Sequence, residues 1–447
     1  MTTLTTKDVP MSQAQRQWYE AACSKIDLER LKQLIFDLTA KHSPTGAERE
    51  ACEFMADYLN SVGIKAHYQP ITDISGNCYG RVKGSGGGPT MMLYAPIDTL
   101  LEGDPEQDLP HAGPVHRADM RPEPYIDGDL VIGLGASNPK SMLALLTEAL
   151  TCVVEADVEL KGDVVIATAG GGMPWIVPER NHTGISNGVN YLLSHGVTAD
   201  FGVICKPWDD IYYEHPGMVW FKVTVWGNMG YAGIPRGIPG FRSSIIPAAK
   251  VILDLEEWLI EYPDKHTSDQ VKPQGWISAL RCGWPDKPAF PGAATEIWLD
   301  VRTSPLQKAA QVEREFDQVM NAILARHDDV EAEWETVVTC DASATDPDHW
   351  VVQSALRAWK EVHGEPYPGA PHMAGQTDAA TINRTGFPLV RIGYAWLGES
   401  DMPAEFTEGL GGMGVIRVPD LEISVKEAIY TVIDSCTRTR EEVGLTD

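Results

Sequence analysis

The sequence has no apolar run that approaches the ~20 residues needed to span a bilayer, and residues 1–20 lack the apolar core of a secretory signal. Basic residues are scarce, because 36 Lys and Arg stand against 63 Asp and Glu, which gives a formal net charge of −27. A field of this sign repels nucleic acid and anionic membranes, so neither is expected as a partner. These absences predict a cytoplasmic protein.

The eight cysteines form no Cys-x-x-Cys pair. Their scatter excludes a zinc knuckle and a small disulfide scaffold, and predicts reduced, mostly buried thiols. What is present is an ordinary globular composition, with 43% hydrophobic and 22% charged residues in a chain of 447. At roughly 150 residues per domain this length predicts two or three domains, each large enough to bury a hydrophobic core.

Three short apolar runs predict the buried strands of a sheet. They span 90–95, 162–168 and 199–205, and helical periodicity occurs over 12–62 and 140–153. Strands that alternate with helices predict an α/β layer whose sheet is largely parallel.

The pattern changes after residue 214. Alternation with period two, typical of half-exposed antiparallel strands, is now interleaved with helices. The segments concerned are strands 218–226, 294–302 and 330–339 and helices 247–262 and 306–327, after which the α/β pattern resumes with helix 349–363, strand 388–392 and helix 423–442. We predict a discontinuous α/β domain over 1–214 and 340–447, interrupted by a two-layer α+β domain over 215–339.

Six local strings occur in an order that matches one family. They are Ser43-Pro44-Thr45-Gly46 with Glu48, Leu93 to Asp98, Gly133 to Lys140, Trp226 to Pro235, Asp300-Val301-Arg302 and Gly375 to Asp378. In this order, and across the same change of domain, they resemble the M20 metallopeptidases, the relatives of aminoacylase and carboxypeptidase G2. The resemblance covers most of the chain. It implies a zinc-peptidase-like α/β catalytic domain with an inserted lid or dimerisation domain.

The residues that carry the chemistry in that family are replaced here. The family binds two zinc ions through His and carboxylate ligands and uses a Glu as general base. The matching positions of this chain are Pro96, Asn138, Ala169 to Gly172, Lys206 and Tyr231, and no His occurs over 410–414. Ligands and negative charges are lost, and Lys206 adds a positive charge. Losing ions and ligands together avoids an uncompensated buried charge, so we expect no metal and no cofactor at this place.

The polar residues that remain at these positions form the candidate site. Asp98 follows a buried strand, and open α/β sheets place ligands at such strand ends. Lys140 and Lys206 are expected to supply cations beside it. The predicted catalytic residues are Asp98, Lys140 and Tyr231, and the predicted substrate-binding residues are Asn138, Lys206, Asn228, Arg236, Arg302 and Asp378.

Three classes of function remain open. The favoured one is a metal-independent enzyme that hydrolyses an amide or related C–N bond of a small carboxylated molecule, because the family hydrolyses amides. The second is a non-catalytic binding or regulatory protein, and the third is a metal-dependent amidohydrolase with new ligands such as Glu179 and His182. Cys205 beside Lys206 is interpreted as a buried thiol, because no neighbouring His serves as its base.

The altered cleft is expected to prefer an anionic, flat substrate. Lys140, Lys206, Arg236 and Arg302 make the local field positive despite the charge of the whole chain. Candidate apolar walls are supplied by three tryptophans in adjacent loops, Trp175, Trp208 and Trp396.

A homodimer is also expected, because relatives dimerise through the inserted domain. The strand 218–226 resembles an edge strand, and with the helix 247–262 it carries more apolar residues than a solvated face needs. The predicted contact residues are Trp220, Val225, Ile252, Leu255 and Leu259.

Overall fold

The chain divides into two units in the computed structural model, which describes residues 4–235, 240–394, 397, 402–406 and 413–446. The large unit holds Thr2–Tyr213, Thr345–Ala370 and Thr377–Asp447, and the small unit holds Glu214–Ala344 and Pro371–Gln376. The insert predicted from the sequence, 215–339, is the main part of the small unit.

The large unit is built on a six-stranded sheet. Its order is β1 (Lys65–Pro70), β2 (Gly76–Val82), β6 (Val164–Ala169), β3 (Met91–Tyr94), β9 (Phe201–Pro207) and β16 (Leu389–Tyr394). The last four pair in parallel, and β2 and β1 add an antiparallel edge. Because the parallel strands run in one direction, their carboxyl ends meet at one edge of the sheet.

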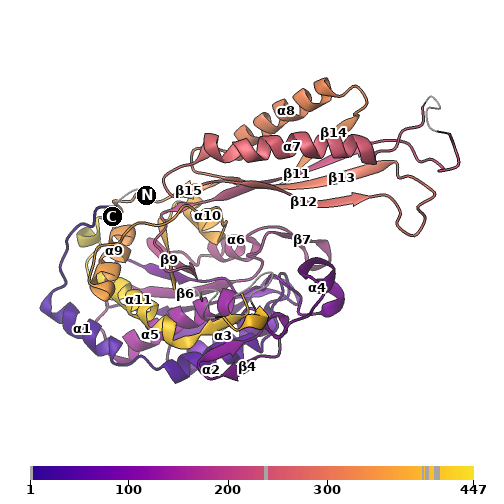
Figure 1. Cartoon of the computed structure of the whole chain (residues 1–447). Helices are drawn as coiled ribbons and strands as arrows, with labels where there is room; N and C mark the ends of the chain where they lie inside the picture. Colours follow the sequence, from indigo (N-terminus) through magenta and orange to yellow (C-terminus); the bar gives the residue numbers. More distant parts are fainter. Residues whose placement is uncertain (1–3, 236–239, 395–396, 398–401, 407–412, 447) are drawn as a thin grey trace. The chain divides into compact units, whose positions relative to one another are not determined.

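Helices cover both faces of this sheet (Figure 1). One core is enclosed by α1 (Gln13–Cys23), α2 (Leu28–Thr39), α3 (Arg49–Ser61), α5 (Met142–Glu155), α9 (Trp350–His363) and α11 (Leu421–Cys436), and the other by α6 (Asn187–Ser194) and α10 (Asp378–Arg384). Along β3, Leu93 faces the first core, whereas Met92 and Tyr94 face the second. Strands buried on both faces are typical of parallel sheets. The predicted α/β fold is confirmed.

Shorter elements complete the large unit. They are α4 (Pro105–Ala112), the hairpin of β7 (Trp175–Val177) and β8 (His182–Gly184), and the sheet of β4 (Tyr125–Asp127), β5 (Leu130–Ile132) and β17 (Val415–Arg417). α4 begins where Asp104 accepts the backbone N–H of Glu106, with Pro105 in the first turn. Strands of three residues carry no periodic pattern, so the sequence does not predict them.

The small unit is an antiparallel sheet with two helices packed on it (Figure 1). Its order is β12 (Gly275–Cys282), β13 (Ala294–Thr303), β11 (Gly217–Trp226) and β14 (Ala332–Cys340), and β10 (Glu214–His215) pairs separately with β15 (Ser343–Ala344). The helices are α7 (Ile245–His266) and α8 (Ala309–Arg326), and Phe221 of β11 stacks on Phe316 of α8. The sequence analysis misses β12 because most of its residues are exposed, which leaves no clear alternation.

The predicted dimer contact is wrong in its residues. β11 is an inner strand of the sheet rather than an edge, and Val225, Leu255 and Leu259 are buried in the core of the small unit itself. An apolar pattern on one face does not distinguish an inner strand from an edge strand, which explains the error. The exposed apolar residues of α7 are instead Ile245, Ile246, Leu253 and Ile260. The homodimer itself stays a prediction.

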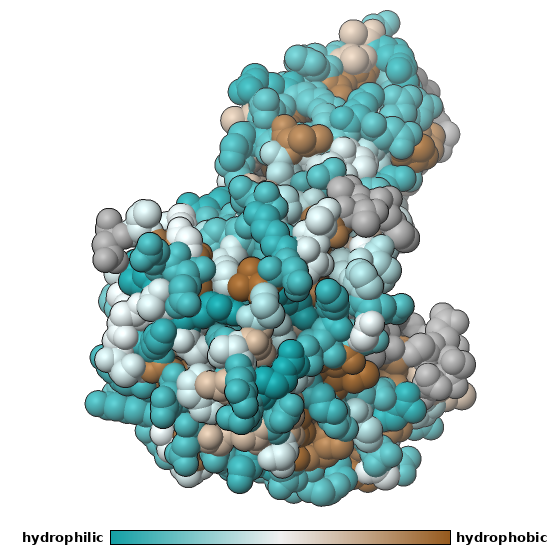
Figure 2. Space-filling model, turned by 90° about the vertical axis from the view of Figure 1, so that its left-hand side faces the viewer, coloured by the Kyte–Doolittle hydropathy of each residue, from teal (hydrophilic) through white to brown (hydrophobic). Residues whose placement is uncertain are grey.

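The polar surface and the free cysteines match what the amino-acid composition predicts. Polar residues cover most of the face shown in Figure 2, and the apolar patches on it are separate. None of the described helices is long and apolar enough to cross a membrane. All eight cysteines are free and six are buried, as predicted.

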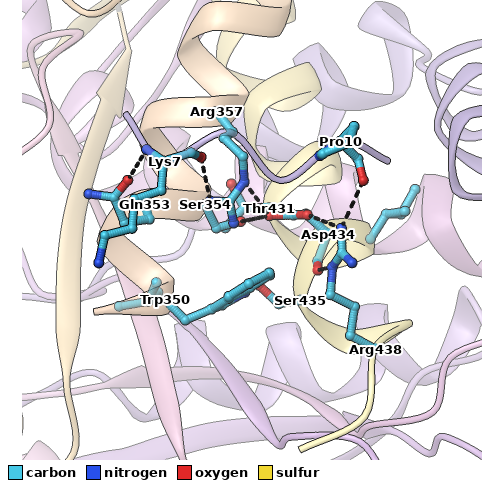
Figure 3. A network of polar contacts seen from close by, with 12 residues as sticks. Lys7, Pro10, Trp350, Gln353, Ser354, Arg357, Thr431, Asp434, Ser435 and Arg438 are labelled. Carbon is cyan, nitrogen blue, oxygen red and sulfur yellow. Dashed lines mark hydrogen bonds and ion pairs between the residues drawn. The ribbon is translucent and has the colours of Figure 1, made fainter. Parts of the chain in front are cut away.

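A buried ion pair joins α9 to α11 in the large unit (Figure 3). Asp434 is fully buried, and its Oδ2 accepts hydrogen bonds from Ser354 Oγ at 2.7 Å and Arg357 Nη2 at 2.6 Å. Its Oδ1 accepts from Arg438 Nη2 at 3.1 Å. One carboxylate therefore pairs with two guanidinium groups that are themselves largely buried, and it offsets one of their two positive charges.

The same two arginines hold the N-terminal segment (Figure 3). Arg357 donates to the carbonyl of Lys7 at 3.3 Å, and Arg438 donates to the carbonyl of Pro10 at 3.4 Å. The Trp350 ring lies under both guanidinium carbons, at 4.5 and 5.2 Å from its centroid. The segment before α1 is thus tied to α9 and α11 by charge-assisted hydrogen bonds.

Candidate functional site

The carboxyl ends of β3, β6 and β9 bring polar residues together at one edge of the large sheet. Asp98 lies four residues beyond β3, and the loop Gly170–Gly172 follows β6 directly. Lys206 is the second-to-last residue of β9. Asp378 reaches the same edge from the start of α10. This is the place where open α/β sheets bind ligands.

The Asp98 carboxylate is fully buried and only half satisfied. Its Oδ2 accepts hydrogen bonds from Thr45 Oγ1 and from the backbone N–H of Met173, both at 2.8 Å. Its Oδ1 has no hydrogen-bond partner among the described residues. Burial raises the pKa of Asp98, and the nearby Asp378 carboxylate adds to the rise. A buried acceptor without a protein partner is free to accept a hydrogen bond from a ligand or a water molecule.

Asp378 faces Asp98 across Gly172. Its Oδ2 accepts from Tyr94 Oη at 2.5 Å and its Oδ1 from Ser186 Oγ at 2.6 Å. A Cβ on Gly172 would lie 2.8 Å from Asp378 Oδ2 and 3.0 Å from Asp98 Oδ1. The two carboxylates are therefore separated by little more than the space of one missing methyl group.

The ammonium group of Lys206 belongs to the same cluster. The side-chain ammonium of Lys206 makes no hydrogen bond or ion pair in the part of the chain that the structure describes. Burial lowers the pKa of Lys206 to about 8, and the negative charges of Asp378 and Asp98 oppose that fall. The site thus offers an unpaired cation beside an unpaired carboxylate oxygen.

Glu48 is a further buried carboxylate behind this edge. It accepts hydrogen bonds from the backbone N–H groups of Gly46 and Gly171 and from Ser75 Oγ. Burial raises the pKa of Glu48 to about 7, and the charge of Asp98 contributes to the rise. A Cβ on Gly170 would lie 2.5 Å from Glu48 Oε2, so the loop fits against this carboxylate only because it lacks side chains.

Two of the predicted residues lie in the turn before α5. Lys140 is buried, and its ammonium donates to the carbonyl of Lys41 and to Ser43 Oγ, while burial lowers the pKa of Lys140 to about 7. These bonds point to a role in holding the segment between α2 and α3. The buried Oδ1 of Asn138 has no hydrogen-bond partner among the described residues, and its Nδ2 approaches only Met413 Sδ at 3.5 Å.

A cavity of about 960 Å³ adjoins Met173, whose N–H binds Asp98. Its lining residues include Leu100, Leu101, Pro174, Trp175 and His111 of α4. Trp175 lines this cavity, and its role as an apolar wall beside the substrate stays a prediction.

Trp208 and Trp396, the other two tryptophans predicted as apolar walls, are not among the described residues that line this cavity. Trp208 is half exposed and lies 5.6 Å from the Arg391 guanidinium, and Trp396 lies outside the described residues.

Comparison with known proteins gives few close relatives and a clear fold. No family model matches the chain. The N-formyl-4-amino-5-aminomethyl-2-methylpyrimidine deformylase of Bacillus subtilis (strain 168) is 23% identical over 449 residues, covering 93% of this chain and 96% of that protein. The M20 family metallo-carboxypeptidase Sso-CP2 from Sulfolobus solfataricus has a TM-score of 0.65 at 15% identity, over 91% of this chain and 98% of that one. The chain has the M20 metallopeptidase fold.

Human carnosine dipeptidase 1 has the same architecture, with a TM-score of 0.69 at 12% identity over 96% of this chain and 100% of that one. The resemblance found in the sequence is confirmed at the level of the fold. A fold shared at such low identity does not carry the reaction with it, so the chemistry has to be argued from the site.

The donors at the strand ends do not fit the two zinc ions of the M20 fold. Among the described residues, no three His, Cys, Asp or Glu side chains around Asp98 and Asp378 place their ligand atoms within 4.8 Å of one another. What lies there is the pair Asp98 and Asp378 beside the cation of Lys206. Zinc sites need at least three nitrogen, sulfur or carboxylate ligands, and a neighbouring ammonium opposes a second positive charge.

The alternative metal ligands considered from the sequence are not assembled. Both ring nitrogens of His182 are engaged, at 3.1 Å from the Met173 carbonyl and 3.0 Å from Asn187 Nδ2. Glu179 is exposed on a short helical turn. Cys205 is buried, as predicted, and burial raises the pKa of its thiol to about 12, which disfavours the reactive thiolate.

The remaining predicted residues belong to the small unit. Tyr231 is exposed and packs near Phe290, and Asn228 donates its backbone N–H to the carbonyl of Arg242. Arg302 forms an ion pair with Asp300 at 2.8 Å. Arg236 lies outside the described residues. Substrate contacts for these four residues stay predictions made from the resemblance.

The sequence analysis assigns no site role to Tyr94, Ser186 or Glu48, although each contacts a carboxylate of the cluster or supplies one. Tyr94 lies inside a predicted strand, where it counts as core. Ser186 has a positive φ of 59° and lies in the segment between β8 and α6, where no sequence motif marks it. Only Glu48 could have been suspected from the sequence. It lies two residues after the string Ser43-Pro44-Thr45-Gly46, and a charged residue so close to a matched motif is a candidate for a role in the site.

Proposed function

We propose that this protein is a metal-independent hydrolase that cleaves an amide or related C–N bond of a small carboxylated molecule. The observation that carries the proposal is the unpaired Asp98 Oδ1 beside the unpaired Lys206 ammonium at the strand ends. Relatives of the same fold are described as a deformylase, a carboxypeptidase and a dipeptidase, which supports hydrolysis as the reaction.

In the proposed reaction Asp98 is the general base. Its Oδ1 takes a proton from a water molecule as the water oxygen attacks the carbonyl carbon, and the same proton then passes to the leaving nitrogen. Burial raises the pKa of Asp98, which makes it a stronger base than an exposed carboxylate. Lys206 stabilises the negative charge that forms on the carbonyl oxygen, and Asp378 keeps Lys206 charged.

The substrate is proposed to be an anion with a flat apolar part. The cavity beside Met173 is large enough for a small molecule, and Trp175 supplies an aromatic wall. Lys206 supports recognition of a negative charge, since it is the cation of the cluster with no partner of its own among the described residues. A homodimer in the cytoplasm without nucleic-acid or membrane partners is part of the same proposal.

The experiment that tests the proposal is hydrolysis by metal-depleted protein. The full chain is treated with a chelator and incubated with N-formyl and N-acyl amino acids, and the released acid is measured by mass spectrometry. We expect turnover that neither the chelator nor added Zn²⁺ changes. Turnover that the chelator abolishes and zinc restores supports a rebuilt metal centre, and saturable binding of the panel without turnover supports a binding protein.

The pH profile should identify Lys206 as the cation that stabilises the negative charge on the carbonyl oxygen. Because burial lowers the pKa of Lys206 to about 8, we expect kcat/KM to fall above about pH 8 as the ammonium loses its proton. Lys206→Arg should move this fall to higher pH, because a guanidinium does not titrate in the accessible range. An alkaline limb that stays in place in Lys206→Arg assigns the titration to another group, such as Lys140, and contradicts the proposed role.

A further inference from the structure

A second cluster of polar side chains lies in the large unit and takes no part in the proposed reaction. It consists of Asp209, His363 and Glu427. Asp209 lies two residues beyond β9, His363 ends α9, and Glu427 lies in α11. α9 and α11 cover one face of the sheet, whereas α10, which carries Asp378, covers the other. Three distant segments therefore bring one imidazole and two carboxylates to one place.

Both carboxylates approach the same nitrogen of the imidazole. His363 Nε2 lies 3.1 Å from Glu427 Oε1 and 3.7 Å from Asp209 Oδ2, and the three ligand atoms all lie within 4.8 Å of one another. In a tetrahedral zinc site with bonds of about 2.0–2.2 Å, neighbouring ligand atoms are roughly 3.3–3.6 Å apart. The two measured distances bracket that spacing, so an ion could enter with small movements of the side chains.

The His363 imidazole is held in a fixed orientation, and the cluster has only this one group to offset two carboxylates. The His363 ring stacks on Trp359 with centroids 3.8 Å apart, which fixes the direction of its nitrogens. Glu427 is buried and Asp209 is partly buried, so two carboxylates lie close together around a single imidazole. A protonated imidazole offsets one of the two negative charges, whereas a divalent cation offsets both.

We propose that Asp209, His363 and Glu427 bind one divalent transition-metal ion, with Zn²⁺ as the best match to one imidazole and two carboxylates and with water completing the tetrahedron. The ion joins the end of β9 to α9 and α11 and so stabilises the folded large unit by an amount that grows with the logarithm of the free ion concentration above Kd. If the purified protein contains one zinc ion per chain, this site accounts for it, and the two-zinc centre of relatives is not needed to explain it.

The test is metal binding by the full chain after treatment with a chelator. Zn²⁺ is titrated by calorimetry and Co²⁺ by visible absorption, and we expect one equivalent of each to bind, with tetrahedral Co²⁺ bands and a higher melting temperature. Asp209→Asn and His363→Ala should each lower the affinity, the latter by more than ~100-fold, because loss of even an outer-shell partner typically costs about 10–100-fold.

The matched control is His266→Ala. His266 pairs with Glu315 at 3.0 Å on the small unit, and no third ligand joins them among the described residues, so this variant should bind both ions as the unchanged chain does. Absence of binding by the unchanged chain, or binding that survives both Asp209→Asn and His363→Ala, overturns the proposal. The readouts need no substrate, so failure of the proposed hydrolysis leaves this test intact.

Discussion

Asp98→Asn is expected to lower kcat/KM by about 10²–10⁴-fold, the contribution typical of a positioned general base. Asn has the same shape, and its oxygen still accepts the hydrogen bonds from Thr45 and Met173. It cannot take a proton from water, so the loss falls on the chemical step. The measurement is the steady-state rate on a substrate found with metal-depleted protein.

The same variant should be more stable at neutral pH. The folded-state pKa of Asp98 lies above its unfolded value, so the ionised carboxylate costs stability at every pH above the unfolded pKa. A neutral side chain removes that cost, and we expect a melting temperature at pH 8 equal to or above that of the unchanged chain. Loss of activity with gain of stability is the pattern of a residue retained for function.

The matched control for this prediction is Asp163→Asn. Asp163 precedes β6, at the opposite end of the strand from the site, and pairs with Arg81 at 2.8 Å. Its replacement should leave kcat/KM unchanged. Near-normal activity of Asp98→Asn, with the control behaving alike, would remove Asp98 from the mechanism.

Asp434→Ala is expected to lower the free energy of unfolding of the large unit by about 3–5 kcal/mol. The substitution leaves the guanidinium groups of Arg357 and Arg438 largely buried without their shared carboxylate. Urea denaturation followed by circular dichroism measures the change. Limited proteolysis should also cut the segment around Lys7 faster, because the two arginines that hold it lose their fixed positions.

An exposed ion pair provides the comparison for this loss. Arg16 pairs with Glu361 at the surface, and Arg16→Ala should cost less than about 1 kcal/mol, since surface pairs contribute little. A loss as small as this in Asp434→Ala would show that the buried network adds nothing beyond a surface pair.

Much of the fold could be predicted from the sequence because its strands are buried on both faces. Strands β3, β6 and β9 appear as short apolar runs, and the change to period two marks the small unit. Prediction fails where the local pattern says little about packing. β12 is mostly exposed and gives no alternation, and the inner position of β11 depends on which strands pair with it.

The candidate site could be predicted in part. Asp98 and Lys206 end strands that the sequence identifies, so their meeting at one edge follows from parallel pairing. Tyr94 and Ser186 could not be found in this way, because their role depends on Asp378. This residue is 284 positions from Tyr94 and 192 positions from Ser186 in the chain. The ammonium of Lys140 binds Lys41 and Ser43, and the charge of Asp98 opposes the fall that burial causes in the pKa of Lys140, so the expected catalytic role of Lys140 stays a prediction.

The glycine loop after β6 also sets how this protein can change by mutation. Gly170 and Gly172 pack so closely against Glu48, Asp98 and Asp378 that an added Cβ would lie 2.5–3.0 Å from a carboxylate oxygen. A side chain at either position therefore displaces a carboxylate that is already held by hydrogen bonds. The lack of side chains in this loop thus restricts which substitutions the chain can accept next to its buried carboxylates.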